Sequence, residues 1–265
     1  MAMISPLSFA TIFGSRPRGP RRPVRLPTAK PGMPDMLRWL SALAAMLLWL
    51  APPAQAQNNA LPTTDLLLAL MVDASGSVNQ YRFELQRKGY ADAFRNRQVL
   101  NAIRGGANGS IAALMVQWTG YNMQAQAVSW TLIKDEKSAN AFADAIEAAP
   151  RQLFGGGTSI SGAIDHAMLL LPNAPYKGIK RVIDISGDGS NNRGRDVREA
   201  RDEAVRAGVV INGLPIVALE WGLDKYFYDN VIGGPGAFIV PADSYENFSQ
   251  AIVRKLILEI AMNNR

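Results

Sequence analysis

The apolar run Leu66–Val72 restricts the fold more than any other feature of the sequence. It contains no polar residue at alternate positions, so a strand built from it must be covered on both faces, as in the centre of a parallel sheet. The run ends in Asp73-Ala74-Ser75-Gly76-Ser77. A carboxylate and two hydroxyls would therefore lie where α/β sheets bind ligands, and hard divalent cations prefer such oxygen donors.

Short apolar runs alternate with longer amphipathic runs from Asp65 onward, a pattern typical of βα units. We expect an α/β fold with three layers: a mostly parallel, Rossmann-like central sheet with one antiparallel edge strand, and helices on both faces. The edge strand follows from the short turn Thr119–Ala125, which favours a hairpin.

The predicted strands are Asp65–Val72, Gly109–Trp118, Gln126–Leu132, Arg181–Ile185, Val209–Ala218 and Ala237–Val240. The first, fourth and fifth are apolar throughout, which predicts central positions. The predicted helices are Asn79–Asn101, Ser138–Ala148, Ser159–Leu171, Arg195–Ala207, Lys225–Val231 and Tyr245–Met262.

Residues 1–56 have the parts of a leader and secretory signal peptide. An uncharged apolar segment, Trp39–Ala51, follows Arg38 and precedes Ala54-Gln55-Ala56, a small-x-small cleavage motif. The Arg- and Pro-rich segment before it either lengthens the n-region of the signal or is not translated, in which case Met36 would start a compact signal peptide. We therefore expect an exported protein, periplasmic or extracellular, whose single domain fills residues 61–262. The last predicted helix carries charges throughout and would not span a membrane, so no anchor remains after cleavage.

Charge and cysteine content exclude several function classes for the mature chain. The leader holds seven of the 28 basic and one of the 22 acidic side chains, so 21 of each remain and the formal net charge is zero. A nucleic-acid partner, which requires a basic face, is therefore not expected. The chain contains no cysteine, which excludes disulfides, thiol catalysis and zinc–thiolate sites.

Two further segments would join Asp73 at the carboxyl edge of the sheet. Gly155-Gly156-Gly157-Thr158 is a glycine-rich loop before a helix, and Asp188-Gly189 follows a strand. Because the carboxyl ends of parallel strands meet at one edge, Asp188 and the Thr158 hydroxyl would approach Asp73. Taken alone, Asp73–Ser77 is equally consistent with a turn that caps a helix.

With Thr158 and Asp188 included, the sequence resembles the von Willebrand factor type A (VWA) domain and its metal-ion-dependent adhesion site (MIDAS). The family pattern is D-x-S-x-S after the first strand, a Thr in a Gly-rich loop, and D-G after the central strand. Asp73, Ser75, Ser77, Thr158 and Asp188 match it in order. The segments around Asp73 and Ser186–Asn192 further resemble a bacterial, secreted subgroup of these domains with no assigned function.

The resemblance implies a VWA-like domain that binds Mg²⁺, or Mn²⁺ or Ca²⁺, through these five residues. It implies that Ser75 and Ser77 bind the ion directly, Thr158 directly or through water, and Asp73 and Asp188 mainly through water. A protein ligand presenting Asp or Glu would complete the octahedral shell. The protein would thus be a non-enzymatic adhesion or assembly module. The residues expected on the partner-binding rim are Tyr121, Asn122, Gly157, Ser190, Asn191 and Trp221.

Alternatives to this interpretation make different predictions. Asp73 after a strand is also compatible with a magnesium-dependent hydrolase or phosphatase, although Ser75 stands where those enzymes need a second carboxylate. His166 falls inside a predicted helix without a G-x-S-x-G motif, which favours a structural role. Asp184 departs from the VWA pattern, where an apolar residue is usual. It would either accept hydrogen bonds behind the metal site or pair with Lys180 or Arg181 near the surface, because an unpaired buried carboxylate is costly.

Overall fold

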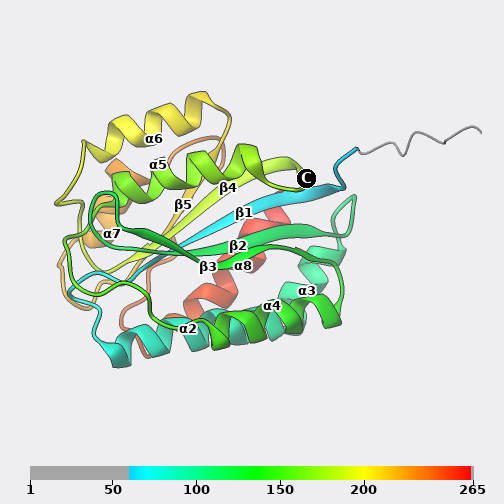
Figure 1. The fold of residues 1–265 in the computed structure, drawn as a ribbon, viewed down its shortest axis with the longest axis horizontal. Coiled ribbons are helices and arrows are strands. Elements are labelled where there is room, and N and C mark those ends of the chain that lie inside the picture. Colours follow the sequence, from blue (N-terminus) through cyan, green and yellow to red (C-terminus); the bar gives the residue numbers. More distant parts are fainter. Residues whose placement is uncertain (1–59, 264–265) are drawn as a thin grey trace, which may run out of the picture. The chain divides into compact units, whose positions relative to one another are not determined.

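Five strands form one sheet in the order β3-β2-β1-β4-β5, with β1 (Thr63–Asp73) at its centre (Figure 1). The structure is a computed structural model that describes residues 60–263, so the predicted leader and signal peptide lie outside the described residues. β1 pairs in parallel with β2 (Ile111–Trp118) and with β4 (Lys177–Gly187). The sheet thus brings the ends of β1 and β4 side by side, as the positions of Asp73 and Asp188 require.

The edges of the sheet differ in direction. β3 (Gln124–Ile133) pairs antiparallel with β2, which confirms the predicted hairpin and the mostly parallel α/β fold. β5 (Val210–Pro215) pairs in parallel with β4 and is the opposite edge. The prediction that the fifth strand is central is therefore wrong. Its apolar residues are buried because helices cover both faces.

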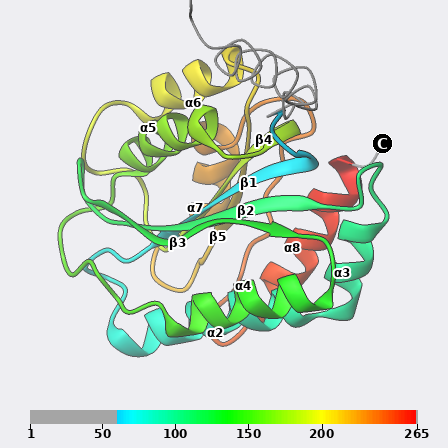
Figure 2. The same cartoon turned by 45° about the vertical axis from the view of Figure 1, so that its right-hand side comes forward.

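Helices cover the two faces of the sheet (Figures 1 and 2). One layer holds α2 (Gln80–Arg95), α3 (Arg97–Arg104), α4 (Glu136–Ala148) and α8 (Phe248–Asn263). The other holds α5 (Ile160–Leu170), followed by the 3₁₀ turn Leu171–Asn173, α6 (Val197–Arg206) and α7 (Leu223–Tyr226), which continues as the π-helical turn Phe227–Val231. Leu66, Leu68 and Leu70 of β1 pack in the first layer and Leu67, Ala69 and Met71 in the second. This two-sided burial explains the absence of polar alternation in the strand.

Several predicted boundaries were wrong for local reasons. The predicted helix Asn79–Asn101 is broken at Asn96, which has extended backbone angles and whose side chain accepts a hydrogen bond from Gln98 N. Asn favours such caps over helix interiors because its amide competes for backbone groups. The predicted strand Ala237–Val240 forms only the isolated bridge between Ile239 and Gly213.

Asp184 has a different partner from the one predicted. Its Oδ1 lies 2.7 Å from Nζ of Lys255 on α8, and both side chains are fully buried. Lys255 Nζ also lies 3.4 Å from Oε2 of Glu259, whose Oε1 accepts a hydrogen bond from Asn212. The sequence indicated only that the helix carrying Lys255 and Glu259 is too charged to span a membrane. Packing of α8 against β4 and β5 buries both side chains. No helix within residues 60–263 is both long and apolar enough to cross a membrane.

We expect Lys255→Met to lower the free energy of unfolding by about 3–5 kcal/mol, because it leaves Asp184 and Glu259 buried without their shared cation. Lys225→Met is the matched control. Lys225 forms an exposed pair with Asp229, and such pairs contribute about 0–1 kcal/mol. Urea unfolding of both variants measures the difference, and equal effects would show that the buried cluster contributes little.

Candidate metal centre

Asp73 ends β1 with a completely buried side chain. Its Oδ1 accepts a hydrogen bond from Ser75 N at 2.7 Å, and its Oδ2 accepts one from Asp188 N at 3.4 Å. One carboxylate therefore holds the loop after β1 against the loop after β4. A Cβ placed on Gly187 would lie 3.1 Å from Asp73 Oδ2, so the glycine allows this close approach.

The hydroxyls of the first loop continue the network. Ser75 Oγ lies 3.1 Å from Ser77 Oγ, and Ser77 Oγ donates a hydrogen bond of 2.5 Å to Asp188 Oδ1. Asp188 Oδ2 accepts a hydrogen bond of 2.7 Å from the hydroxyl of Tyr245, a residue just before α8. The fold thus brings together four of the five predicted ligands in one hydrogen-bonded chain.

Thr158 joins this group through the glycine-rich loop. Its N–H donates to Asn192 Oδ1 at 2.9 Å, and its carbonyl accepts from Asn192 N at 2.8 Å, so the loop is fixed to the segment after Asp188. A Cβ placed on Gly189 would lie 3.6 Å from Thr158 Oγ1. The Thr158 hydroxyl therefore borders the residue next to Asp188.

The two carboxylates of the cluster repel each other. Burial, and then the negative charge of Asp188, raise the pKa of Asp73 to about 7. None of the ion pairs within residues 60–263 involves Asp73 or Asp188. A cation bound between the two carboxylates would offset their repulsion.

The donor set determines which cation fits. Within the described residues, no group of three or more His, Cys, Asp or Glu side chains is placed to hold a metal. An ion at this edge of the sheet would therefore need the Ser and Thr hydroxyls in addition to carboxylate oxygens. An all-oxygen set of this kind fits a hard cation such as Mg²⁺ and disfavours soft transition metals.

Three residues that support the cluster had no recognisable signal in the sequence. Arg82 on α2 donates to Ser77 O at 2.6 Å, and its guanidinium lies 5.4 Å from the ring centre of Tyr245. Arg151 donates to Ala74 O at 3.0 Å. The two arginines hold the first loop through its carbonyls, and Tyr245 donates to Asp188. None of these contacts follows a strand or helix period that the sequence would reveal.

The predicted rim residues have different surroundings. Trp221 is 99% exposed and Tyr121 is 51% exposed. Asn122 is exposed too and has a positive φ of 61°, which Asn tolerates in a tight turn. Ser190 N donates to Glu220 Oε2 at 2.8 Å. Gly157 lies under Arg193, because a Cβ placed there would clash with the Arg193 side chain.

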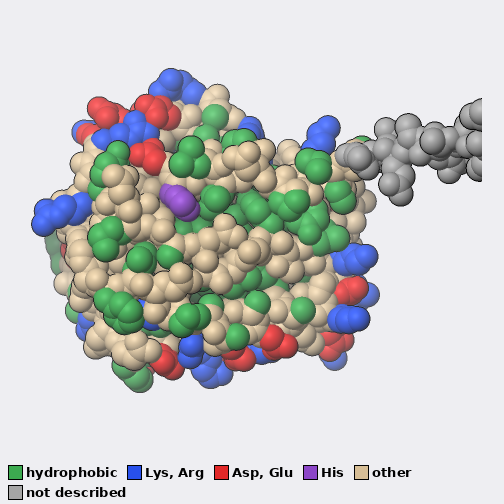
Figure 3. Space-filling model, viewed as in Figure 1, with side chains coloured by type: hydrophobic (Ala, Val, Ile, Leu, Met, Phe, Trp, Pro, Cys, Tyr) green, Lys and Arg blue, Asp and Glu red, His purple; other side chains and the backbone are tan. Residues whose placement is uncertain are grey.

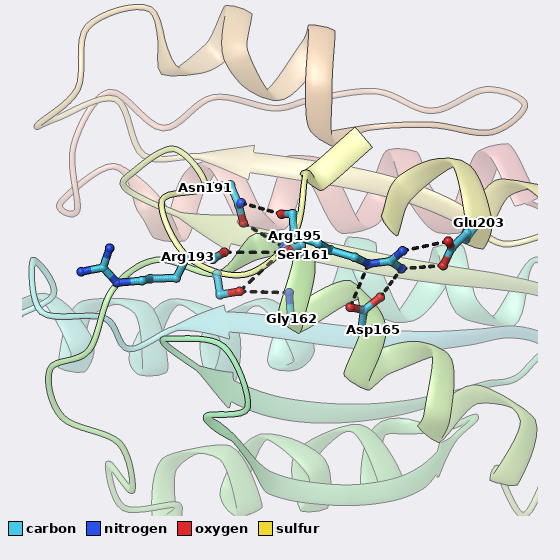
Figure 4. A network of polar contacts seen from close by, with 8 residues as sticks. Ser161, Gly162, Asp165, Asn191, Arg193, Arg195 and Glu203 are labelled. Atoms are coloured by element: carbon cyan, nitrogen blue, oxygen red, sulfur yellow. Dashed lines mark hydrogen bonds and ion pairs between the residues drawn. The ribbon is translucent and has the colours of Figure 1, made fainter. Parts of the chain in front are cut away.

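Asn191 takes part in an internal network (Figure 4). Its Oδ1 accepts from Ser161 N at 3.0 Å and its Nδ2 donates to Arg195 O at 3.1 Å. The Arg195 guanidinium in turn forms ion pairs with Asp165 of α5 and Glu203 of α6. The Asn191 amide therefore fixes the loop after Asp188, whereas the Arg193 side chain extends away from the network.

His166 lies within α5, and Figure 3 shows the single histidine side chain at the surface of that face. Partial burial lowers its pKa. It takes no part in the hydrogen bonds around Asp73 and Asp188. The structure therefore gives no support for a Ser-His-Asp arrangement at this edge of the sheet.

Residues 63–264 match the profile of a family described as "Protein of unknown function (DUF1194)". The chain belongs to this family. No curated protein sequence is detectably similar to it.

Solved structures with VWA-like folds resemble this domain. Proximal thread matrix protein 1 of the mussel byssus, solved with a zinc-occupied MIDAS motif, has a TM-score of 0.55 at 18% identity, over 76% of this chain and 47% of its own. The pilus adhesin SpaC of Lactobacillus rhamnosus GG, in its open conformation, has a TM-score of 0.55 at 16% identity, over 78% of this chain and 31% of its own. A von Willebrand factor type A protein from Catenulispora acidiphila has a TM-score of 0.51 at 13% identity, over 76% of this chain and 43% of its own.

This DUF1194 chain spans less than half the length of those three proteins. At such low identities the likeness establishes the fold alone. The domain is therefore VWA-like in its α/β architecture, and its chemistry must be argued from its own residues.

In the presence of a chelator, we expect wild-type stability to fall as pH rises, relative to Asp73→Asn. The folded protein keeps a proton on Asp73 up to about pH 7, whereas the unfolded chain loses it near its ordinary pKa of 3.8. Between these two pH values the free energy of unfolding of the wild type falls by up to about 1.4 kcal/mol per pH unit. The Asn variant lacks the titrating carboxyl and shows no such fall. Urea unfolding from pH 4 to pH 8 measures the difference. Parallel stability curves would show that Asp73 is not strained by burial and by Asp188.

Proposed function

We propose that this domain is an exported, non-enzymatic adhesion or assembly module that binds a protein partner through a divalent cation. Asp73, Ser75, Ser77, Thr158 and Asp188 would hold Mg²⁺, or Mn²⁺ or Ca²⁺. The observation that carries the proposal is the hydrogen-bonded chain of Asp73, Ser75, Ser77 and Asp188, in which neither carboxylate forms an ion pair within the described residues and beside which the Thr158 hydroxyl borders Gly189.

The chemistry of this donor set favours a ligand from outside. Three of the five side chains are neutral hydroxyls, and Asp73 is committed to two backbone N–H groups. An ion held by such a set keeps much of its positive charge and needs further oxygen ligands, since Mg²⁺ prefers six. An Asp or Glu side chain of a partner protein supplies both the missing ligand and the missing charge.

The similar structures support this proposal by analogy. One is described with a zinc-occupied MIDAS and another is a pilus adhesin. The predicted signal peptide adds an extracellular or periplasmic setting, in which adhesion or envelope assembly is a reasonable role. These are associations that complement the site geometry.

The burial of Asp73 disfavours a hydrolase. A nucleophilic carboxylate must reach the substrate, but Asp73 is completely buried and accepts two backbone hydrogen bonds. Ser75 occupies the place of the second carboxylate that such phosphatases need. Turnover of a phosphate ester that Asp73→Ala abolishes would nevertheless replace the adhesion proposal with an enzymatic one.

We expect Mg²⁺ or Mn²⁺ to raise the melting temperature of the mature domain, because a ligand that binds only the folded state contributes about 2.7 kcal/mol at 100 times its Kd. Asp73→Ala and Thr158→Ala should lose this stabilisation. Asp92→Ala, which removes a carboxylate from a surface ion pair on α2, should retain it. Thermal unfolding with metal and with EDTA tests this, and a wild type that does not respond to either cation would refute the site.

Trp221→Ala should leave stability and cation binding unchanged but weaken partner capture at least several-fold. A fully exposed Trp beside the site makes few contacts within the domain and is a typical anchor residue in interfaces. The measurement is a pull-down from envelope extract with and without chelator. Leu169→Ala is the control, since Leu169 is 67% exposed near the end of α5 that lies away from the site. Equal capture by both variants would remove Trp221 from the rim.

A further inference from the structure

A third carboxylate, that of Glu220, lies beside the candidate metal centre. Glu220 follows β5 and stands between Leu219 and Trp221, which are 50% and 99% exposed. Its own side chain is half-buried and turned inward, where Oε2 accepts the hydrogen bond from Ser190 N. The loop thus directs its two apolar residues to solvent and its acidic residue towards the segment that carries Asp188.

The space over Gly189 links Glu220 to the candidate ligands. A Cβ placed on Gly189 would lie 3.6 Å from Thr158 Oγ1 and 3.7 Å from Glu220 Oε2. The same small space, next to Asp188, is therefore bordered by the Glu220 carboxylate and by the Thr158 hydroxyl, which is expected to bind the cation. Both distances are ordinary van der Waals separations, so the space over Gly189 has room for an added atom between the two groups.

We propose that Glu220 is an internal ligand of the bound cation, and that a partner's Asp or Glu must displace it. This inference rests on the proposed function, because it assumes that the five residues hold a cation. Glu220 has the carboxylate chemistry that the site lacks, and it is tethered on a short loop. Its effective concentration therefore exceeds that of a free partner, so weakly binding acidic groups do not compete with it.

Glu220→Gln separates the ligand role from a purely structural one. The Gln oxygen can still accept the Ser190 N–H, so the loop keeps its hydrogen bond while the negative charge is lost. Asp224→Asn is the matched control, because it removes an exposed carboxylate four residues further along, in α7. Glu220→Ala, which removes both oxygens, provides a second variant, and thermal unfolding with EDTA shows that all of them fold.

The experiment uses Mn²⁺ alone as the probe, with calorimetry for its Kd and water-proton relaxation for the number of water molecules on the bound ion. We expect Glu220→Gln and Glu220→Ala to bind Mn²⁺ about tenfold more weakly than wild type, since carboxylate ligands set cation affinity. Glu220→Ala should carry one more bound water. Acetate, as a mimic of the partner's carboxylate, should displace water from the Glu220 variants at lower concentration than from wild type. Asp224→Asn should match wild type throughout.

The outcomes distinguish this inference from the proposed function. In one outcome, wild type binds Mn²⁺ and Asp73→Ala does not, which supports the metal site. If the Glu220 variants then match wild type in affinity and in the number of bound waters, Glu220 is not a ligand of the ion. An equal response to acetate, including none, overturns the competition. If wild type binds no Mn²⁺, both proposals are wrong.

Discussion

The burial of Asp73 is the interaction on which the rest of the site depends. Its two oxygens accept backbone N–H groups from the loop after β1 and from the loop after β4. This arrangement fixes the two loops against each other and at the same time places a carboxylate beside Asp188. Burial and the nearby Asp188 carboxylate therefore disfavour the charged form of Asp73 and raise its pKa. A bound cation would offset this repulsion.

The C-terminal helix supports the same arrangement from a distance. α8 is held against β4 and β5 by the buried cluster of Asp184, Lys255 and Glu259. Tyr245, just before this helix, donates its hydroxyl to Asp188. The hydrogen bonds around the candidate metal centre therefore extend to the start of α8, in addition to the two loops that the sequence pattern identifies.

The sequence predicted the α/β class, the antiparallel edge strand and the five candidate ligands, because each depends on local patterns. Leu66–Val72 is apolar throughout because both of its faces are covered, and Asp73–Ser77 follows it directly. The helix break at Asn96 was missed because one capping amide outweighs an amphipathic pattern that continues across it. The edge position of β5 was missed because an edge strand covered on both faces is as apolar as a central one.

The sequence by itself identified the candidate oxygen ligands and the α/β class, in which Asp73 and Asp188 each follow a strand and Thr158 precedes a helix. Only the tertiary structure decided that Ser77 reaches Asp188, that Lys255 pairs with Asp184, and that Glu220 and Thr158 both border the space over Gly189. The physical reason is that strand and helix periods record which face of an element is buried. Contacts between side chains far apart in the chain depend on how those elements pack, and no local period encodes them.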